Sequence, residues 1–76
     1  MHEWLEAAEA KLGGDVRLTA AEQQALLELA RVAAHTSGDR RNAPLVTFLV
    51  GVARGRGDTR SVEELVAEIV GDVDVA

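Results

Sequence analysis

The fold of this chain is decided by LARVAAH at residues 29–35 and, after a short polar loop, by APLVTFLVG at residues 43–51. The second stretch is apolar on every side of a helix, so we expect the rest of the molecule to surround it. Pro44 lacks a backbone N–H, and the N–H groups of a first helical turn have no partner within the helix. A proline is therefore favoured there and indicates a helix start. A buried strand is the alternative, because Val46 and Phe48 favour strands. We prefer the helix, since the run is long and no second strand is predicted elsewhere.

Length and composition limit the chain to one small domain. Of its 76 residues, 47% are hydrophobic, but these include only one Phe and one Trp. The core must therefore consist of Leu, Val, Ile and Ala, which suits closely packed helices. We expect a cytoplasmic protein without a membrane span. Residues 1–12 are rich in glutamate where a signal peptide would be basic, and the apolar run 43–53 is too short to cross a bilayer.

Helix-start and helix-stop signals divide the chain into four helices. Thr19 and Ser61 are each followed three residues later by a glutamate, which predicts a capping box at the start of the second and fourth helices. Gly13, Gly38 and Gly71 are expected to end the first, second and fourth helices, because glycine adopts the left-handed cap conformation readily. The predicted helices span residues 2–12, 20–36, 43–54 and 62–70.

These helices predict an all-α fold, a compact four-helix domain with a buried central third helix. The domain is expected to cover residues 1–71, and residues 72–76 read as a frayed acidic tail. In the first helix, Trp4 lies on an apolar stripe opposite three glutamates. Trp4 is most simply a core anchor, but a half-exposed tryptophan is also typical of an interface, which would make the chain a homodimer.

The charge of the chain is unevenly distributed along the sequence. The net charge of −5 argues against nucleic-acid binding. Residues 40–60 nevertheless hold five arginines against a single aspartate, whereas the segments on either side are acidic. An acidic body with basic loops is therefore the main electrostatic feature.

One cluster of residues is a candidate site for a small anion or a nucleotide. Arg31 and His35 share a helix face, and Arg41 stands just before the third helix, whose N-terminal N–H groups favour a phosphate or carboxylate. A structural role is the alternative, with His35 capping its helix and Arg31 paired with Glu28 or Asp39. Thr47 either contacts the same ligand or bonds back to a carbonyl one turn earlier.

No residues predict catalysis, a cofactor or a metal. The chain has no cysteine, and its two histidines are not accompanied by carboxylates at ligand spacing. Neither of its two serines, Ser37 and Ser61, has a predictable general base as partner. An enzyme would have to use His35 as its general acid or base and Arg31 to bind an anionic substrate. Because no other residues point to catalysis, we expect a protein without enzymatic activity.

The sequence resembles a small bacterial family of unknown function, whose members occur alone or joined to the C-terminus of molybdenum cofactor guanylyltransferase, the molybdopterin-guanine dinucleotide biosynthesis protein A. The resemblance rests on Trp4 and on the matching residues Leu29-Ala30-Arg31, Ala34-His35, Arg41, Ala43-Pro44-Leu45, Thr47-Phe48-Leu49 and Gly51. The family usually has a second proline in the arginine loop, where this chain has Asn42. No catalytic residue is carried over from the family.

The resemblance implies a context in molybdenum cofactor biosynthesis, with the guanylyltransferase as a possible protein partner. The chain cannot be that enzyme, because it lacks the glycine-rich nucleotide-binding loop and the acidic metal ligands that the reaction needs. Our leading hypothesis is a non-enzymatic helical accessory module that binds a protein partner. The alternative is a small-anion or nucleotide-binding domain that uses Arg31, His35 and Arg41.

Overall fold

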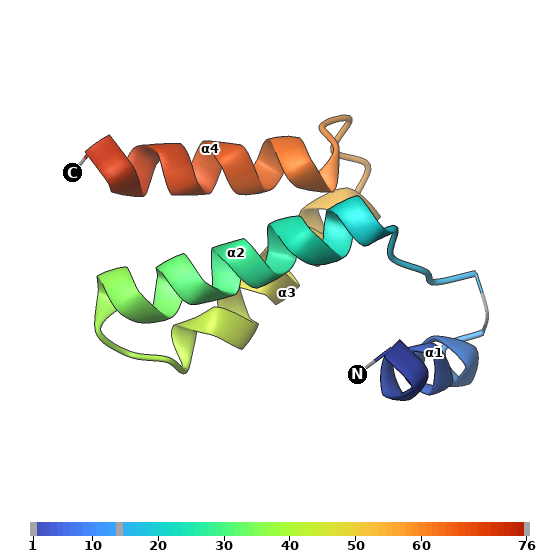
Figure 1. Ribbon diagram of the computed structural model, residues 1–76. Coiled ribbons are helices and arrows are strands. Elements are labelled where there is room, and N and C mark those ends of the chain that lie inside the picture. The colour runs from blue at the N-terminus through green and yellow to red at the C-terminus, as the bar shows by residue number, and fades with distance from the viewer. Residues whose placement is uncertain (1, 14, 76) are drawn as a thin grey trace.

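The computed structural model describes the backbone of residues 2–13 and 15–75 and the side chains of 3–13 and 15–71. Within these ranges the chain forms four helices and no strand (Figure 1). The helices are α1 (His2–Lys11), α2 (Ala20–Ser37), α3 (Asn42–Gly55) and α4 (Val62–Val75). The predicted all-α fold is confirmed, and the helical interpretation of residues 43–51 is correct.

The predicted caps fix where α2 and α4 begin. Thr19 Oγ1 accepts a hydrogen bond from the Glu22 backbone N–H at 3.0 Å, and Glu22 Oε1 accepts one from the Thr19 N–H at 2.8 Å. Ser61 and Glu64 exchange the same two bonds at 3.0 and 2.9 Å. Each box satisfies N–H groups that would otherwise have no partner at a helix start. At the other end of α2, Gly38 has the left-handed φ of 74° that closes a helix.

The end of the fourth helix differs from the prediction. We expected Gly71 to end it, but α4 continues to Val75. Ala76, the last residue of the predicted frayed tail, lies outside the described residues. The predicted end is wrong because Gly71 does not adopt a positive φ, which is what makes glycine a helix terminator. A glycine inside a helix costs only about 1 kcal/mol relative to alanine, so it weakens the helix without stopping it.

The core of the molecule is centred on α2, which packs against both α3 and α4, while α3 and α4 make a smaller contact with each other. Leu29 of α2 is only 1% exposed. Around it lie Val50 of α3 and three residues of the first turns of α4, Val62, Leu65 and Val66. The predicted burial of the third helix at the centre of the domain is therefore wrong, since α2 holds that position.

Only one side of α3 is buried. Val50 is in the core with Val46 and Ala53 packed beside it, but Leu45, Phe48 and Leu49 are 62%, 71% and 62% exposed. The reason is that a helix which is apolar all round needs neighbours on every side, and α3 has only α2 and α4. The remaining helix, α1, does not pack against it.

Helix α1 stands apart from the α2–α3–α4 core and is joined to it by an extended connector (Figure 1). Glu9 Oε2 accepts a hydrogen bond from the Leu18 backbone N–H at 3.0 Å, which ties α1 to the end of the connector. Trp4 is 78% exposed, so it is not the core anchor that the sequence most simply predicted. The interface interpretation of Trp4 stays a prediction.

Candidate functional site

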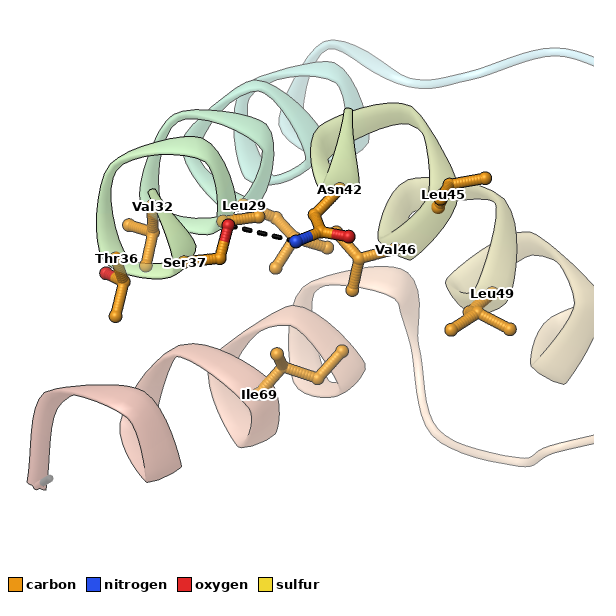
Figure 2. A pocket seen from close by; sticks show the side chains of 10 residues that line it. Leu29, Val32, Thr36, Ser37, Asn42, Leu45, Val46, Leu49 and Ile69 are labelled. Atoms are coloured by element: carbon orange, nitrogen blue, oxygen red, sulfur yellow. Dashed lines mark hydrogen bonds between the residues drawn. The ribbon is translucent and has the colours of Figure 1, made fainter. Parts of the chain in front are cut away.

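An apolar groove crosses the face of the core where α2, α3 and α4 meet (Figure 2). Its volume is about 330 Å³. We call it the core groove, and its lining is formed by Leu29, Val32, Ala33, Thr36, Ser37, Asn42, Leu45, Val46, Leu49 and Ile69. Figure 2 shows Ile69 reaching from α4 toward the side of α3 that carries Val46 and Leu49. The groove lies between α3 and α4, over the central helix α2.

The polar end of the core groove is held by local hydrogen bonds of the α2–α3 loop. Asn42 Nδ2 donates to Ser37 Oγ at 3.0 Å, the bond drawn in Figure 2. The same Ser37 hydroxyl accepts from the Asp39 backbone N–H at 3.2 Å and donates to the Asp39 carbonyl at 3.1 Å. These bonds occupy the polar groups at this end, so the groove offers mainly apolar surface to a ligand.

Beyond Leu49 and Ile69 the surface continues into a second hollow of about 210 Å³ between α3 and α4. Its floor includes the core residue Val50, and its far end carries Arg60 and Glu68. The two hollows together form a shallow apolar track along α3 with opposite charges at one end. Such a surface has the apolar character that binds an apolar chain segment.

The described residues offer no place for a metal ion, since no group of three or more His, Asp or Glu side chains comes together among them. Among the described helices, none combines the length and the apolar character that a bilayer crossing requires.

Three of the four residues of the predicted anion site, Arg31, Arg41 and Thr47, engage a neighbour in sequence. Arg31 pairs with Glu28, with its Nη2 2.5 Å from Oε1, and this hydrogen bond lowers the pKa of Glu28. His35 lies exposed in the last turn of α2. Thr47 Oγ1 donates to the Pro44 carbonyl at 3.0 Å, which confirms the predicted bond to the preceding turn. The Glu28 pairing agrees with the structural alternative, and anion binding stays a prediction.

Arg41 belongs to a turn that the sequence analysis overlooked. Asp39 Oδ1 accepts from the Arg41 backbone N–H at 2.9 Å, and Asp39 Oδ2 accepts from Arg41 Nη2 at 2.7 Å. The side-chain hydrogen bond raises the pKa of Arg41 and lowers that of Asp39. The carboxylate thus neutralises the arginine that we expected to meet an external anion.

The α3–α4 loop repeats the same arrangement one helix later. Asp58 Oδ1 accepts from the Arg60 backbone N–H at 2.9 Å, and Asp58 Oδ2 accepts from Arg60 Nη2 at 2.7 Å. Arg54 also donates from Nη1 to the carbonyls of Asp58 and Arg60, at 2.7 and 3.0 Å. The signal was present in the sequence, because each loop contains an aspartate two residues before an arginine. Arg41, Arg54 and Arg60 therefore each stabilise a loop of their own chain.

Acid should weaken the fold through the Asp58 turn. Hydrogen bonds from the Arg60 side chain and backbone lower the pKa of Asp58 from 3.8 to about 2. A carboxyl whose pKa is lower in the folded state contributes stability above its unfolded pKa and loses it as the pH falls through the folded value. We expect the urea midpoint of the wild type to fall between pH 4 and pH 2, and that of Asp58→Asn to fall less steeply.

The matched control for this prediction is Glu63→Gln, because Glu63 is exposed on α4. The control variant should keep the wild-type pH profile between pH 4 and pH 2. Equal slopes for the wild type and Asp58→Asn would show that the turn contributes nothing to the acid response. The expected effect is small, since the turn is on the surface.

A third hollow, also apolar, lies between α1 and the start of α2. This hollow, which we call the α1–α2 cleft, has a volume of about 440 Å³ and is lined by Trp4, Leu5, Leu18, Gln23, Leu26 and Leu27. It brings Trp4 opposite the 52%-exposed Leu27. Helical periodicity alone does not distinguish a core-facing leucine such as Leu29 from one such as Leu27 that faces this cleft.

Comparison with known proteins gives a family for the chain. A family model described as a domain of unknown function (DUF6457) matches residues 1–74. Neither the curated proteins nor the solved structures contain a match to the chain. The matched range includes α1, α2, α3 and all of α4 except Val75, together with the core groove and the α1–α2 cleft.

Proposed function

The chain belongs to the DUF6457 family, a domain of unknown function, and from that premise we propose that it is a non-enzymatic protein-interaction module. The observation that carries the proposal is the exposure of Leu45, Phe48 and Leu49 beside the core groove. Large apolar side chains grouped on the surface of a small domain are typical of a binding site. Apart from the pair Arg60 and Glu68 at its far end, the track carries no charge that would repel an apolar partner.

The ligand that suits this track is an amphipathic helix of a partner protein. The groove runs between two helices over an apolar floor, which is the geometry in which a helix lays its apolar face into a groove. A partner helix between α3 and α4 would give the three-helix core its fourth member and cover Leu49 and Ile69. The charged pair at the far end of the track would then orient the partner helix.

For the partner itself we propose molybdenum cofactor guanylyltransferase. The support is the resemblance of residues 29–51 to a family whose members also occur joined to that enzyme. Two domains that are fused in some proteins commonly associate when they are separate, because fusion raises the effective concentration of a pre-existing contact. In this proposal the chain contributes binding, and all of the guanylyl-transfer chemistry belongs to the enzyme.

Leu49→Asp should abolish binding to the guanylyltransferase without unfolding the chain. Leu49 is 62% exposed and lines both hollows of the track, so an aspartate there disrupts the contact and not the core. A central interface residue contributes about 2 kcal/mol or more, and we expect the dissociation constant measured by calorimetric titration to rise at least about 30-fold.

Ala67→Asp is the control, because it adds the same charge at an exposed position of α4 that does not line the track. It should bind like the wild type, and circular dichroism should show that both variants are folded. If the wild type gives no binding heat with the purified enzyme, the guanylyltransferase is not the partner. If Leu49→Asp binds as tightly as Ala67→Asp, the core groove is not the binding surface.

A further inference from the structure

The α1–α2 cleft has two apolar walls that belong to the same chain and face each other across open space. Trp4 and Leu5 of α1 form one wall, and Leu26 and Leu27 form most of the wall on α2. Protein interiors hold few voids larger than a water molecule, so a hollow of about 440 Å³ between two apolar walls is an unfinished contact. Bringing the walls together would remove apolar surface from water, which is favourable.

Helix α1 can move without disturbing the core. Among the described residues, the core cluster and the side chains packed against it all belong to α2, α3 and α4. No Cα atom of α1 lies within 8 Å of a Cα atom of the other three described helices. An element with so few close contacts opens and shifts more easily than the elements of a core. A change in the position of α1 therefore breaks no contact of the core cluster.

A fixed point for such a movement lies near the C-terminal end of α1. The Leu18 backbone N–H donates to Glu9 Oε2 at 3.0 Å, which holds this half of α1 beside the start of α2. Gly13, where the chain leaves α1, has a positive φ of 107°, a conformation that glycine adopts without strain. Because a helix rises 1.5 Å per residue, Trp4 lies about 7.5 Å from Glu9 along the axis. The free end of α1 therefore carries the tryptophan.

Closing the cleft would bury very little polar surface. Its lining contains one polar side chain, Gln23, whose Nε2 already donates to the Leu18 carbonyl at 3.4 Å. Glu6 and Glu9 lie outside the cleft, in a separate hollow with Arg17. Because burying an unpaired charge is costly, walls without charged side chains favour closure.

We propose that α1 is a hinged arm that closes the α1–α2 cleft. The arm alternates between the open position of Figure 1 and a closed position in which Trp4 and Leu5 pack against Leu27 of the same chain. The hydrogen bond between Glu9 and Leu18 is the pivot in both positions. Trp4 and Leu27 are 78% and 52% exposed in the open position and become buried in the closed one. The position of the arm thus decides whether this apolar surface is accessible.

A disulfide between the two walls tests the proposal in the full chain. The chain has no cysteine, so Leu5→Cys with Leu27→Cys introduces a single possible pair. A disulfide requires Cα atoms about 4.4–6.8 Å apart, whereas those of α1 and α2 are more than 8 Å apart in the open position. On mild oxidation we expect an intramolecular disulfide to form at least about tenfold faster than in the control pair Leu5→Cys with Ala67→Cys. The control cannot close in this way, because α4 and α1 lie on opposite sides of α2 (Figure 1).

Trp4 shows whether the cross-linked chain has a closed cleft. It is the single tryptophan, so the emission has one source. Disulfide formation should move the emission maximum to shorter wavelength and lower acrylamide quenching at least about twofold, because the indole ring leaves water. A reductant should reverse both changes. Circular dichroism should show both double variants folded, since residues 5, 27 and 67 lie outside the core cluster.

The wild type provides a check without any substitution. Nuclear Overhauser contacts between the Trp4 ring and the Leu27 methyl groups are expected, and their intensity relative to contacts within the core should not change with protein concentration. Contacts that vanish on dilution would show that a second copy covers the cleft, and the proposal would be wrong. The complete absence of these contacts would exclude the closed position.

The cross-linking results can also overturn the proposal. A disulfide that forms no faster than in the control pair would do so, as would one that joins two molecules. An unchanged Trp4 emission in the cross-linked chain would show that the arm does not close the cleft. The inference does not rest on the proposed function, because none of the cleft residues lines the core groove or the hollow beyond it. Leu49→Asp should therefore leave the rate of disulfide formation unchanged.

Discussion

Replacing Leu29 by alanine is expected to remove a large part of the stability of the fold while leaving most of the population folded at room temperature. Leu29 is 1% exposed and lies where α2 meets both of its neighbours. Leu→Ala substitutions at buried sites cost about 2–5 kcal/mol, because they lose the transfer free energy of the side chain and leave a cavity. A domain of this size has a total stability of about 4–11 kcal/mol, so the substitution removes much of it.

Leu27→Ala provides a matched control on the same helix. Leu27 is 52% exposed, two residues before Leu29, and it faces the α1–α2 cleft. The same chemical change should therefore cost less than about 1 kcal/mol. Urea unfolding followed by far-ultraviolet circular dichroism measures both variants. Equal losses would contradict the assignment of Leu29 to the centre of the core.

The second large effect concerns the two sides of α3. Val50→Asp is expected to prevent folding, because Val50 is 3% exposed in the core cluster. No basic side chain belongs to that cluster, so the new carboxylate would be buried without a partner. An unpaired charge in a core costs several kcal/mol even after structural relaxation, which is comparable to the whole stability of the domain.

Phe48→Asp introduces the same carboxylate two residues earlier and should leave the monomer folded. Phe48 is 71% exposed, so the aspartate remains in water and the core is unchanged. The difference between the two midpoints of thermal unfolding, measured at a concentration where the wild type is monomeric, is the decisive quantity. If both variants unfold, α3 is surrounded on all sides, as its sequence alone suggests.

The parts of the fold that depend on neighbouring residues were predictable from the sequence. Thr19 and Ser61 with their partner glutamates form the expected capping boxes, and Gly38 ends α2 as expected. Pro44 lies in the first turn of α3, although that helix begins slightly earlier, at Asn42. Such signals act over one helical turn, so no knowledge of the tertiary structure is needed to interpret them.

The burial of α3 was not predictable in the same way. An all-apolar pattern indicates that exposing the helix to water is unfavourable. It does not indicate which other element of the fold covers the helix. We expected the rest of the molecule to surround it, with Trp4 of the first helix most simply a core anchor. The extended connector instead places α1 beside the start of α2, and Phe48 is left exposed.

The candidate site was affected by a related limitation. Arg31, His35 and Arg41 have the residue types and spacing of an anion site, and the sequence analysis considered Glu28 and Asp39 as partners of Arg31 but considered no carboxylate as a partner of Arg41. Asp39 stands two residues before Arg41, which is the spacing of a turn that holds the arginine itself. The core groove was invisible for another reason, because its walls come from three helices that meet only in the folded chain.

The order of the helices along the chain has a consequence for the rate of folding. Helices α2 and α3 are joined by the short loop 38–41, and α3 and α4 by the loop 56–61. Closing small loops costs little chain entropy, and helical domains with such local topology fold in about microseconds to milliseconds. Helix α1 takes no part in this search. We therefore expect the core of α2, α3 and α4 to form before α1 takes a fixed position. The apolar side chains of that core are then exposed to water only briefly during folding.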